Sequence, residues 1–175
     1  HDPYFERFDA ASLTADDLAL FPSYLVSLND SDMDDGETAK LLGLLRSNLP
    51  MKVLVRTDDI LAQASQGAGR FSFGAGALQL ATMAVGAVGA YVLQSAGSHL
   101  YRMRDAIGKG MRFQGAALFS VYSGATPAGA GIPAYLSAAA AMQSRAFPAF
   151  TYDPEAGKAW ATRFSVGDNP QSDAD

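Results

Sequence analysis

Five short runs rich in β-branched and aromatic residues recur along the chain, and their starts lie about thirty residues apart. No two-residue Asn-Gly or Asp-Gly turn joins any two of these runs, and each interval is long enough for a helix. This spacing is typical of βαβ units. We therefore predict an α/β fold with a mostly parallel, doubly wound sheet of about five strands and helices on both faces. The predicted strands are residues 23–28 (SYLVSL), 52–56 (KVLVR), 90–94 (AYVLQ), 117–122 (ALFSVY) and 149–152 (AFTY).

The intervals contain helix signals. Ser98 is predicted to cap a helix in which Leu100, Met103, Ile107 and Met111 recur at helical spacing. A short helix is expected after Thr14, and Pro133 suits the first turn of an alanine-rich helix. The longer predicted helices are 36–47, 76–85, 98–112 and 133–145.

These elements divide the chain into three parts. Residues 1–20 are predicted to form an N-terminal arm with one short helix, and residues 21–154 the α/β domain. Residues 155–175 are predicted to be a C-terminal extension, with one turn around Trp160 and a polar tail that frays. The sequence begins at His1 and shows no signal peptide, so we expect a processed chain or a piece of a longer protein.

Composition excludes several functions. The 175 residues include 13 basic and 18 acidic side chains, a net charge of −5, so no positive field attracts nucleic acid. The chain has no cysteine, which excludes disulfides and thiolate metal sites and fits a cytoplasmic location. Residues 71–99 and 113–144 carry no charge, but glycines interrupt the first stretch and prolines the second. We expect buried helices and strands there, and no membrane span.

In a parallel sheet, ligands bind beyond the carboxyl ends of the strands. Three segments are predicted to follow strands at that edge: residues 29–35 (NDSDMDD), 57–74 and 123–131. The first does not fit an EF-hand loop, because Asp35 stands at its sixth position and Leu41 at its twelfth. Its carboxylates fit a solvated turn before a helix N-terminus. No hydrolase motif occurs, and we interpret His99 as a surface or capping residue.

Three stretches between Met51 and Pro154 resemble a known family. They are KVLVRTDDILAQ, AYVLQSAGSHLYRMRDAIGKGMRFQGAALFSVYSG and FPAFTYDP. In this order they resemble the thiamine diphosphate-binding domain of the pyruvate:ferredoxin (2-oxoacid:acceptor) oxidoreductases. The resemblance covers more than half of the chain. It implies the thiamine diphosphate-binding fold and a role in an oxidoreductase that acts on 2-oxoacids.

The resemblance also implies a cofactor site. Enzymes of this family hold thiamine diphosphate through Mg²⁺, whose ligands are an aspartate, a side chain after the next strand and a backbone carbonyl. Asp30, Asp58 and the carbonyl of Ile60 occupy these three positions, and Gln63 occupies that of an asparagine that contacts the cofactor. The family completes its site with a second domain. The implied partners are therefore other domains or subunits of the parent oxidoreductase, and no catalytic residue is assigned within this chain.

The sequence leaves two other hypotheses open. Asn29 and Ser31 stand where the family has glycines, and the acidic stretch 32–35 follows them. The second hypothesis is a non-catalytic structural or interface domain of the same fold, without the cofactor. It predicts partly exposed apolar faces on the alanine-rich segments. The third hypothesis is an unrelated α/β domain that binds a small molecule.

Overall fold

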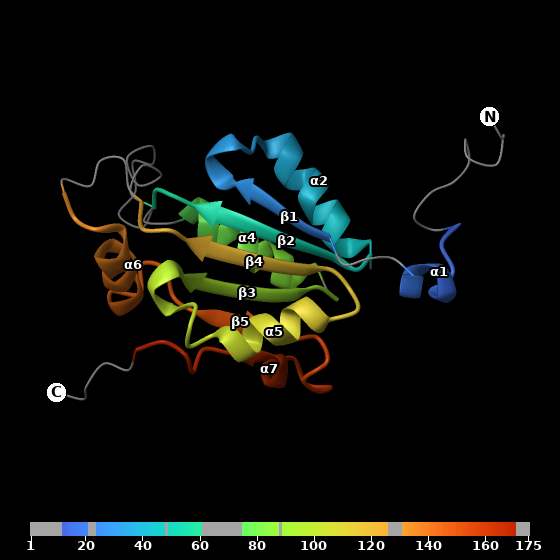
Figure 1. Cartoon of the computed structure of the whole chain (residues 1–175). Coiled ribbons are helices and arrows are strands. Elements are labelled where there is room, and N and C mark those ends of the chain that lie inside the picture. The colour runs from blue at the N-terminus through green and yellow to red at the C-terminus, as the bar shows by residue number, and fades with distance from the viewer. Residues whose placement is uncertain are drawn as a thin grey trace.

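The computed structural model describes residues 12–20, 24–47, 49–60, 75–87, 89–125 and 131–170. Strands and helices alternate through most of that part of the chain, as Figure 1 shows. The strands are β1 (Tyr24–Asn29), β2 (Met51–Thr57), β3 (Tyr91–Ala96), β4 (Ala117–Tyr122), β5 (Phe150–Tyr152) and β6 (Phe164–Ser165). The helices are α1 (Ala15–Leu20), α2 (Asp35–Arg46), α4 (Ala75–Gly86), α5 (Arg104–Arg112), α6 (Ala134–Gln143) and α7 (Trp160–Arg163), with 3₁₀ turns η3 (Asp30–Asp32) and η4 (Gly97–His99).

The strands form one mixed sheet in the order β1-β2-β4-β3-β5-β6. The pairs β1·β2, β2·β4 and β3·β4 are parallel, whereas β5 is antiparallel to both β3 and β6. The α/β class predicted from the sequence is confirmed. The described residues contain a sixth strand, β6, that the sequence did not predict.

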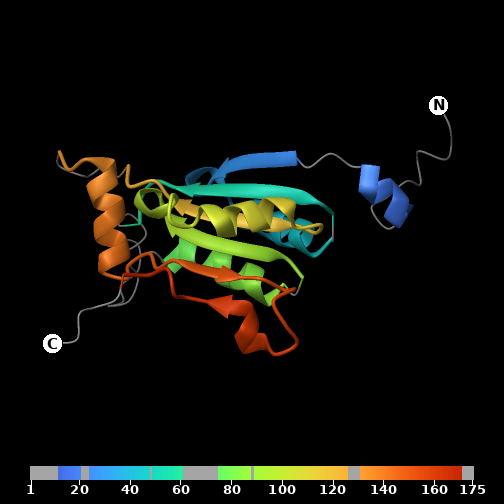
Figure 2. The same cartoon turned by 60° about the horizontal axis from the view of Figure 1, so that its bottom comes forward.

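Helices cover both faces of the sheet. Successive side chains of a strand point to opposite faces, so each face has its own buried cluster. Val53 and Val55 of β2 share one buried cluster with residues of α2 and α4, including Leu41 and Ala84. The other face packs against α5 and against α6, whose Met142 is buried. Figure 2 shows α5 in front of the sheet and α4 behind it, with α6 standing at one end. That end carries the carboxyl termini of the four parallel strands (Figure 1).

Close contacts hold α5 against β3 and β4. The Tyr91 hydroxyl donates a hydrogen bond of 2.8 Å to the Ala106 carbonyl of α5, and burial raises the pKa of Tyr91 to about 12. A side chain at Gly110 would lie 2.6 Å from the Tyr91 ring and 2.9 Å from Phe119, so glycine permits this approach. The buried Lys52 ammonium donates to the carbonyls of residues 113 and 115, which fixes the turn between α5 and β4.

The predicted helix 98–112 begins later than expected. Residues 97–99 form the η4 turn, α5 starts at Arg104, and the N-cap residue Met103 makes no side-chain cap bond. The predicted cap at Ser98 is therefore wrong, since the chain must first turn away from the end of β3. The predicted helical face is nevertheless present, because Met103 is buried and Ile107 packs against the same cluster.

The C-terminal extension belongs to the sheet. Its strand β6 pairs with β5, and Asn169 is 6% exposed. The Asn169 side chain accepts a bond of 2.7 Å from the Ala149 amide and donates to the carbonyls of Ala149 and Val166. The expectation of a fraying tail is thus wrong for residues 166–170, because two hydrogen bonds between Asn169 and Ala149 anchor this segment to the start of β5. Residues 171–175 lie outside the described part.

The two uncharged stretches contain ordinary elements of the fold. Described residues of 71–99 form α4 and β3, and those of 113–144 form β4 and α6. Within the described residues, no helix is both long and apolar enough to cross a membrane. Helix α1 follows Thr14 as predicted and has no buried residue; Figures 1 and 2 show it apart from the sheet.

Candidate functional site

Two predicted site residues lie at the ends of neighbouring parallel strands. Asn29, the last residue of β1, is in register with Arg56 of β2. Asp30 is the first residue of the η3 turn, and Asp58 is the first residue after β2. The register of the two strands therefore places these residues close together. The structure brings these two carboxylates near enough for the charge of Asp58 to act on Asp30.

The Asp58 carboxylate joins three strand ends. Its Oδ1 accepts a hydrogen bond of 2.6 Å from the Ser123 hydroxyl, just beyond β4. Its Oδ2 accepts bonds of 2.9 Å from the Asn29 amide and 3.1 Å from the Arg56 guanidinium. These donors, with Ser123 first, lower the pKa of Asp58, so this carboxyl is ionised at neutral pH. Ser123 also accepts a bond of 3.0 Å from the Ala125 amide, which fixes the loop.

Asp30 is in the opposite situation. Its Oδ2 is buried and has no hydrogen-bond partner among the described residues, and the same is true of the nearby Thr57 Oγ1. Burial raises the pKa of the Asp30 carboxyl, and the charge of Asp58 raises it further. The Thr57 hydroxyl lies near enough to Asp30 to oppose this rise, although its geometry is not that of an ordinary hydrogen bond, and the Ser31 amide opposes the rise as well. The site therefore holds one carboxylate with both oxygens hydrogen-bonded beside another, Asp30, whose buried Oδ2 makes no hydrogen bond of ordinary geometry to a described residue.

A cation would satisfy this arrangement. Asp30 Oδ2 is a free oxygen ligand, and Asp58 uses three of about four lone-pair positions. Hard cations such as Mg²⁺ prefer carboxylate and carbonyl oxygens and keep several waters. No group of three or more His, Cys, Asp or Glu side chains in the described residues could hold a metal ion. A cation here would therefore take its other ligands from backbone, water or a bound ligand.

Of the two other predicted site residues, the structure describes Ile60 but not Gln63. The side chain of Ile60 is 4% exposed and packs in the cluster under α5 and α6, so only its backbone carbonyl is available as a ligand. Gln63 lies outside the described residues. Asn29 and Ser123 were not predicted as site residues. Their only signal in the sequence is their position, since each is a polar residue at the end of an apolar strand.

The acidic stretch after Asp30 is largely structural. Asp34 accepts a bond of 2.7 Å from the Glu37 amide, and Glu37 accepts one of 3.2 Å from the Asp34 amide. This reciprocal capping box starts α2, and Asp35 lies in its first turn. The expectation that these carboxylates serve a helix N-terminus is confirmed.

Comparisons with known proteins give no family. No protein-family model matches the sequence, and no curated protein matches it significantly. The function proposed below therefore rests on the geometry of the site and on the sequence resemblance described above.

The two carboxylates should affect stability in opposite directions. The raised pKa of Asp30 means that its contribution to stability is complete below the ordinary pKa of 3.8 and is lost as the pH rises through the raised value. The lowered pKa of Asp58 means that its contribution is present above 3.8 and is lost as the pH falls. Without metal at neutral pH, Asp30→Asn should therefore stabilise the fold. Asp58→Asn should destabilise it by about 1 kcal/mol, because the half-buried Asn29 and Ser123 lose a charged acceptor.

Denaturant unfolding at pH 7 and at pH 3 measures both effects. The gain from Asp30→Asn should vanish at the lower pH. Asp32→Asn is the matched control, since Asp32 is an exposed acidic residue of the same turn and should leave the stability unchanged. A loss of stability in Asp30→Asn at pH 7 would contradict the description of Asp30 as a carboxyl whose pKa is raised by burial and whose Oδ2 is unsatisfied.

Proposed function

We propose that the chain is a thiamine diphosphate-binding domain of a 2-oxoacid:acceptor oxidoreductase of the pyruvate:ferredoxin type. It contributes Asp30, Asp58 and the Ile60 carbonyl to a Mg²⁺ site, and other domains or subunits of the parent protein complete the cofactor site. A cytoplasmic location belongs to this proposal. The observation that carries it is the buried, unpartnered Oδ2 of Asp30 beside the ionised Asp58.

The connections between the strands support a doubly wound arrangement. The chain passes from β1 through β2 to β3 by way of α2 and α4 on one face, and returns to β4 through α5 on the other. Such a reversal opens a crevice beyond the carboxyl ends of the strands, where ligands bind in open α/β sheets. The Ser123–Asp58 hydrogen bond spans β2 and β4 at this reversal.

The described residues fit the cation of the cofactor. Asp30 and Asp58 would hold the Mg²⁺ that the cofactor needs through their carboxylate oxygens, which are the ligands that this hard cation prefers. When bound, thiamine diphosphate supplies the carbanion chemistry needed to cleave a 2-oxoacid. The chain itself holds and orients the cation. Ser123 and Asn29 act as positioning residues, because they fix both oxygens of Asp58.

Thiamine diphosphate and Mg²⁺ together should raise the thermal stability of the chain. At a free cofactor concentration of about 100 times the dissociation constant, the stabilisation should be roughly 2.7 kcal/mol. Asp30→Ala should abolish the shift, whereas Asp32→Asn should keep it. Omitting Mg²⁺ should also remove it, because the diphosphate faces a carboxylate-rich turn. Calorimetry or dye-based thermal unfolding measures the shift, and its absence at millimolar cofactor would reject the proposal.

A second candidate function, a non-catalytic interface domain, is favoured by an exposed apolar face. On the α5 side of the sheet, a groove of about 160 Å³ is lined only by apolar side chains, among them Leu25, Leu54 and Val121. Leu25 is 55% exposed, and β1 is an uncharged edge strand. Tyr135 and Leu136 of the alanine-rich α6 are also exposed. Under this reading, partner domains of the parent protein cover these surfaces.

The groove can be tested in the isolated chain. If it is an uncovered interface, the chain should bind an apolar fluorescent dye and self-associate weakly in sedimentation velocity. Leu25→Lys should reduce both effects. Met83→Lys is the matched control, because Met83 is similarly exposed on α4, behind the sheet. A monodisperse chain that binds no dye would speak against the interface function.

A further inference from the structure

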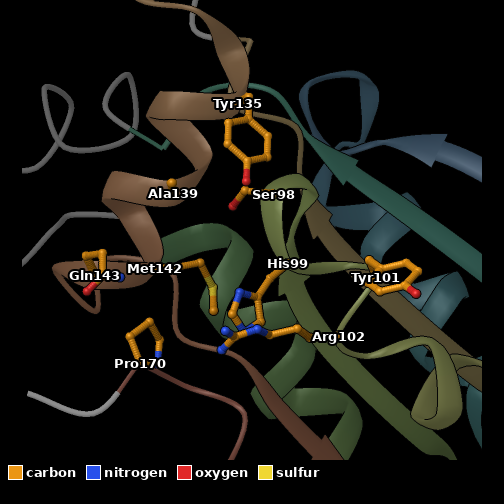
Figure 3. Close-up of a pocket in the computed structure, with 9 residues that line it drawn as sticks. All are labelled: Ser98, His99, Tyr101, Arg102, Tyr135, Ala139, Met142, Gln143 and Pro170. Carbon is orange, nitrogen blue, oxygen red and sulfur yellow. The ribbon is translucent and has the colours of Figure 1, made fainter.

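A second hollow lies at the carboxyl end of β3, and neither Asp30 nor Asp58 lines it. It has a volume of about 400 Å³ and lies between the η4 turn and α6 (Figure 3). Ser98, His99 and Arg102 line it from one side, and Tyr135 and Gln143 of α6 line it from the other. The sequence places these two groups more than thirty residues apart, so no motif marks the pocket.

The pocket gathers hydrogen-bond donors that have no partner among the described residues. Ser98 Oγ is buried and makes no hydrogen bond to a described residue. Figure 3 shows the Tyr135 hydroxyl directed towards Ser98. The side chains of Arg102, Tyr135 and Gln143 make no hydrogen bond or ion pair within the described part of the chain. None of the described residues that line the pocket is a carboxylate, so none of them neutralises the positive charge of Arg102 there.

The wall formed by the C-terminal segment is held in place. His99 Nε2 donates a hydrogen bond of 2.7 Å to the Asp168 carbonyl, which assigns the ring proton to this nitrogen. Arg145 donates a hydrogen bond to the Pro170 carbonyl. The neighbouring residue, the buried Asn169, donates one to the Ala149 carbonyl. Pro170 is therefore fixed at the rim, and the pocket is formed before any ligand binds.

Apolar side chains form the rest of the lining. Met142 is 1% exposed, and Ala139 and Pro170 lie beside it. A ligand that fits this pocket therefore needs an anionic end for Arg102 and Ser98 and a short apolar body for Met142. Arginine is well suited to the anionic end, because its guanidinium binds carboxylate or phosphate oxygens in pairs.

We propose that this pocket binds a small organic anion, with its carboxylate or phosphate held by Arg102, Ser98 and Tyr135 and its apolar part against Met142. The site does not depend on Mg²⁺ or on Asp30 and Asp58. A failure of the cofactor proposal therefore leaves it standing, and the converse also holds.

Three probes with the same butyl chain test the pocket: pentanoate, butyl phosphate and butylammonium. We expect saturable binding of at least one anion in ¹H–¹⁵N NMR titrations without Mg²⁺, with shifts confined to residues 98–102 and 135–143. The stronger of the two anions identifies the anionic group. Butylammonium should not bind, because its charge is repelled by Arg102.

Variants separate the pocket from general charge effects. Arg102→Gln should weaken the anion about tenfold or more, since a charge-assisted bond is lost. Ser98→Ala and Tyr135→Phe should weaken it less. Arg112→Gln is the matched control, because Arg112 lies at the C-terminal end of α5 and does not line the pocket. Equal losses in Arg102→Gln and Arg112→Gln, or no saturable binding of either anion, would overturn the proposal.

Discussion

The hydrogen bonds of Asp58 tie the functional edge of this sheet together. A single carboxylate accepts from a residue at the end of β1, from its own strand β2 and from the loop after β4. Each donor favours its ionised form, so this negative charge is permanent at neutral pH. These bonds hold the ends of β1 and β2 and the loop at Ser123 in fixed positions. The charge of Asp58 also contributes to the raised pKa of Asp30.

Asp30 lies in the field of that fixed charge. Asp58 accepts three hydrogen bonds, whereas the buried Oδ2 of Asp30 makes no hydrogen bond of ordinary geometry to a described residue. Such a group is costly in a folded protein unless it is protonated or meets a cation. Local instability of this kind is typical of binding sites, where a ligand supplies the missing interaction. The same reasoning applies to the pocket at β3, with the sign reversed, since there donors without acceptors surround Arg102.

The sequence predicted the strands better than the connections. Runs such as KVLVR and ALFSVY are apolar and rich in β-branched or aromatic residues, and both form buried strands. The two-residue strand β6 was missed because it is too short to show a pattern, and the start of α5 was misplaced because the η4 turn has no distinctive sequence. The sequence led to Asp30 and Asp58 through strand order and resemblance. Two partners of Asp58, Asn29 and Ser123, are 29 and 65 residues away from it in the sequence. Local sequence patterns cannot reveal contacts at such separations.

The central claim is that Asp30 and Asp58 form a cation site, and the pKa of Asp30 tests it most directly. With ¹³C-labelled aspartate, NMR titration of the side-chain carboxyl can follow Asp30 in the absence and presence of Mg²⁺. We expect a pKa above the ordinary value of 3.8 without the ion and a clear decrease with it, because the cation stabilises the ionised form. A pKa of Asp30 that stays unchanged at millimolar Mg²⁺ would contradict the assignment.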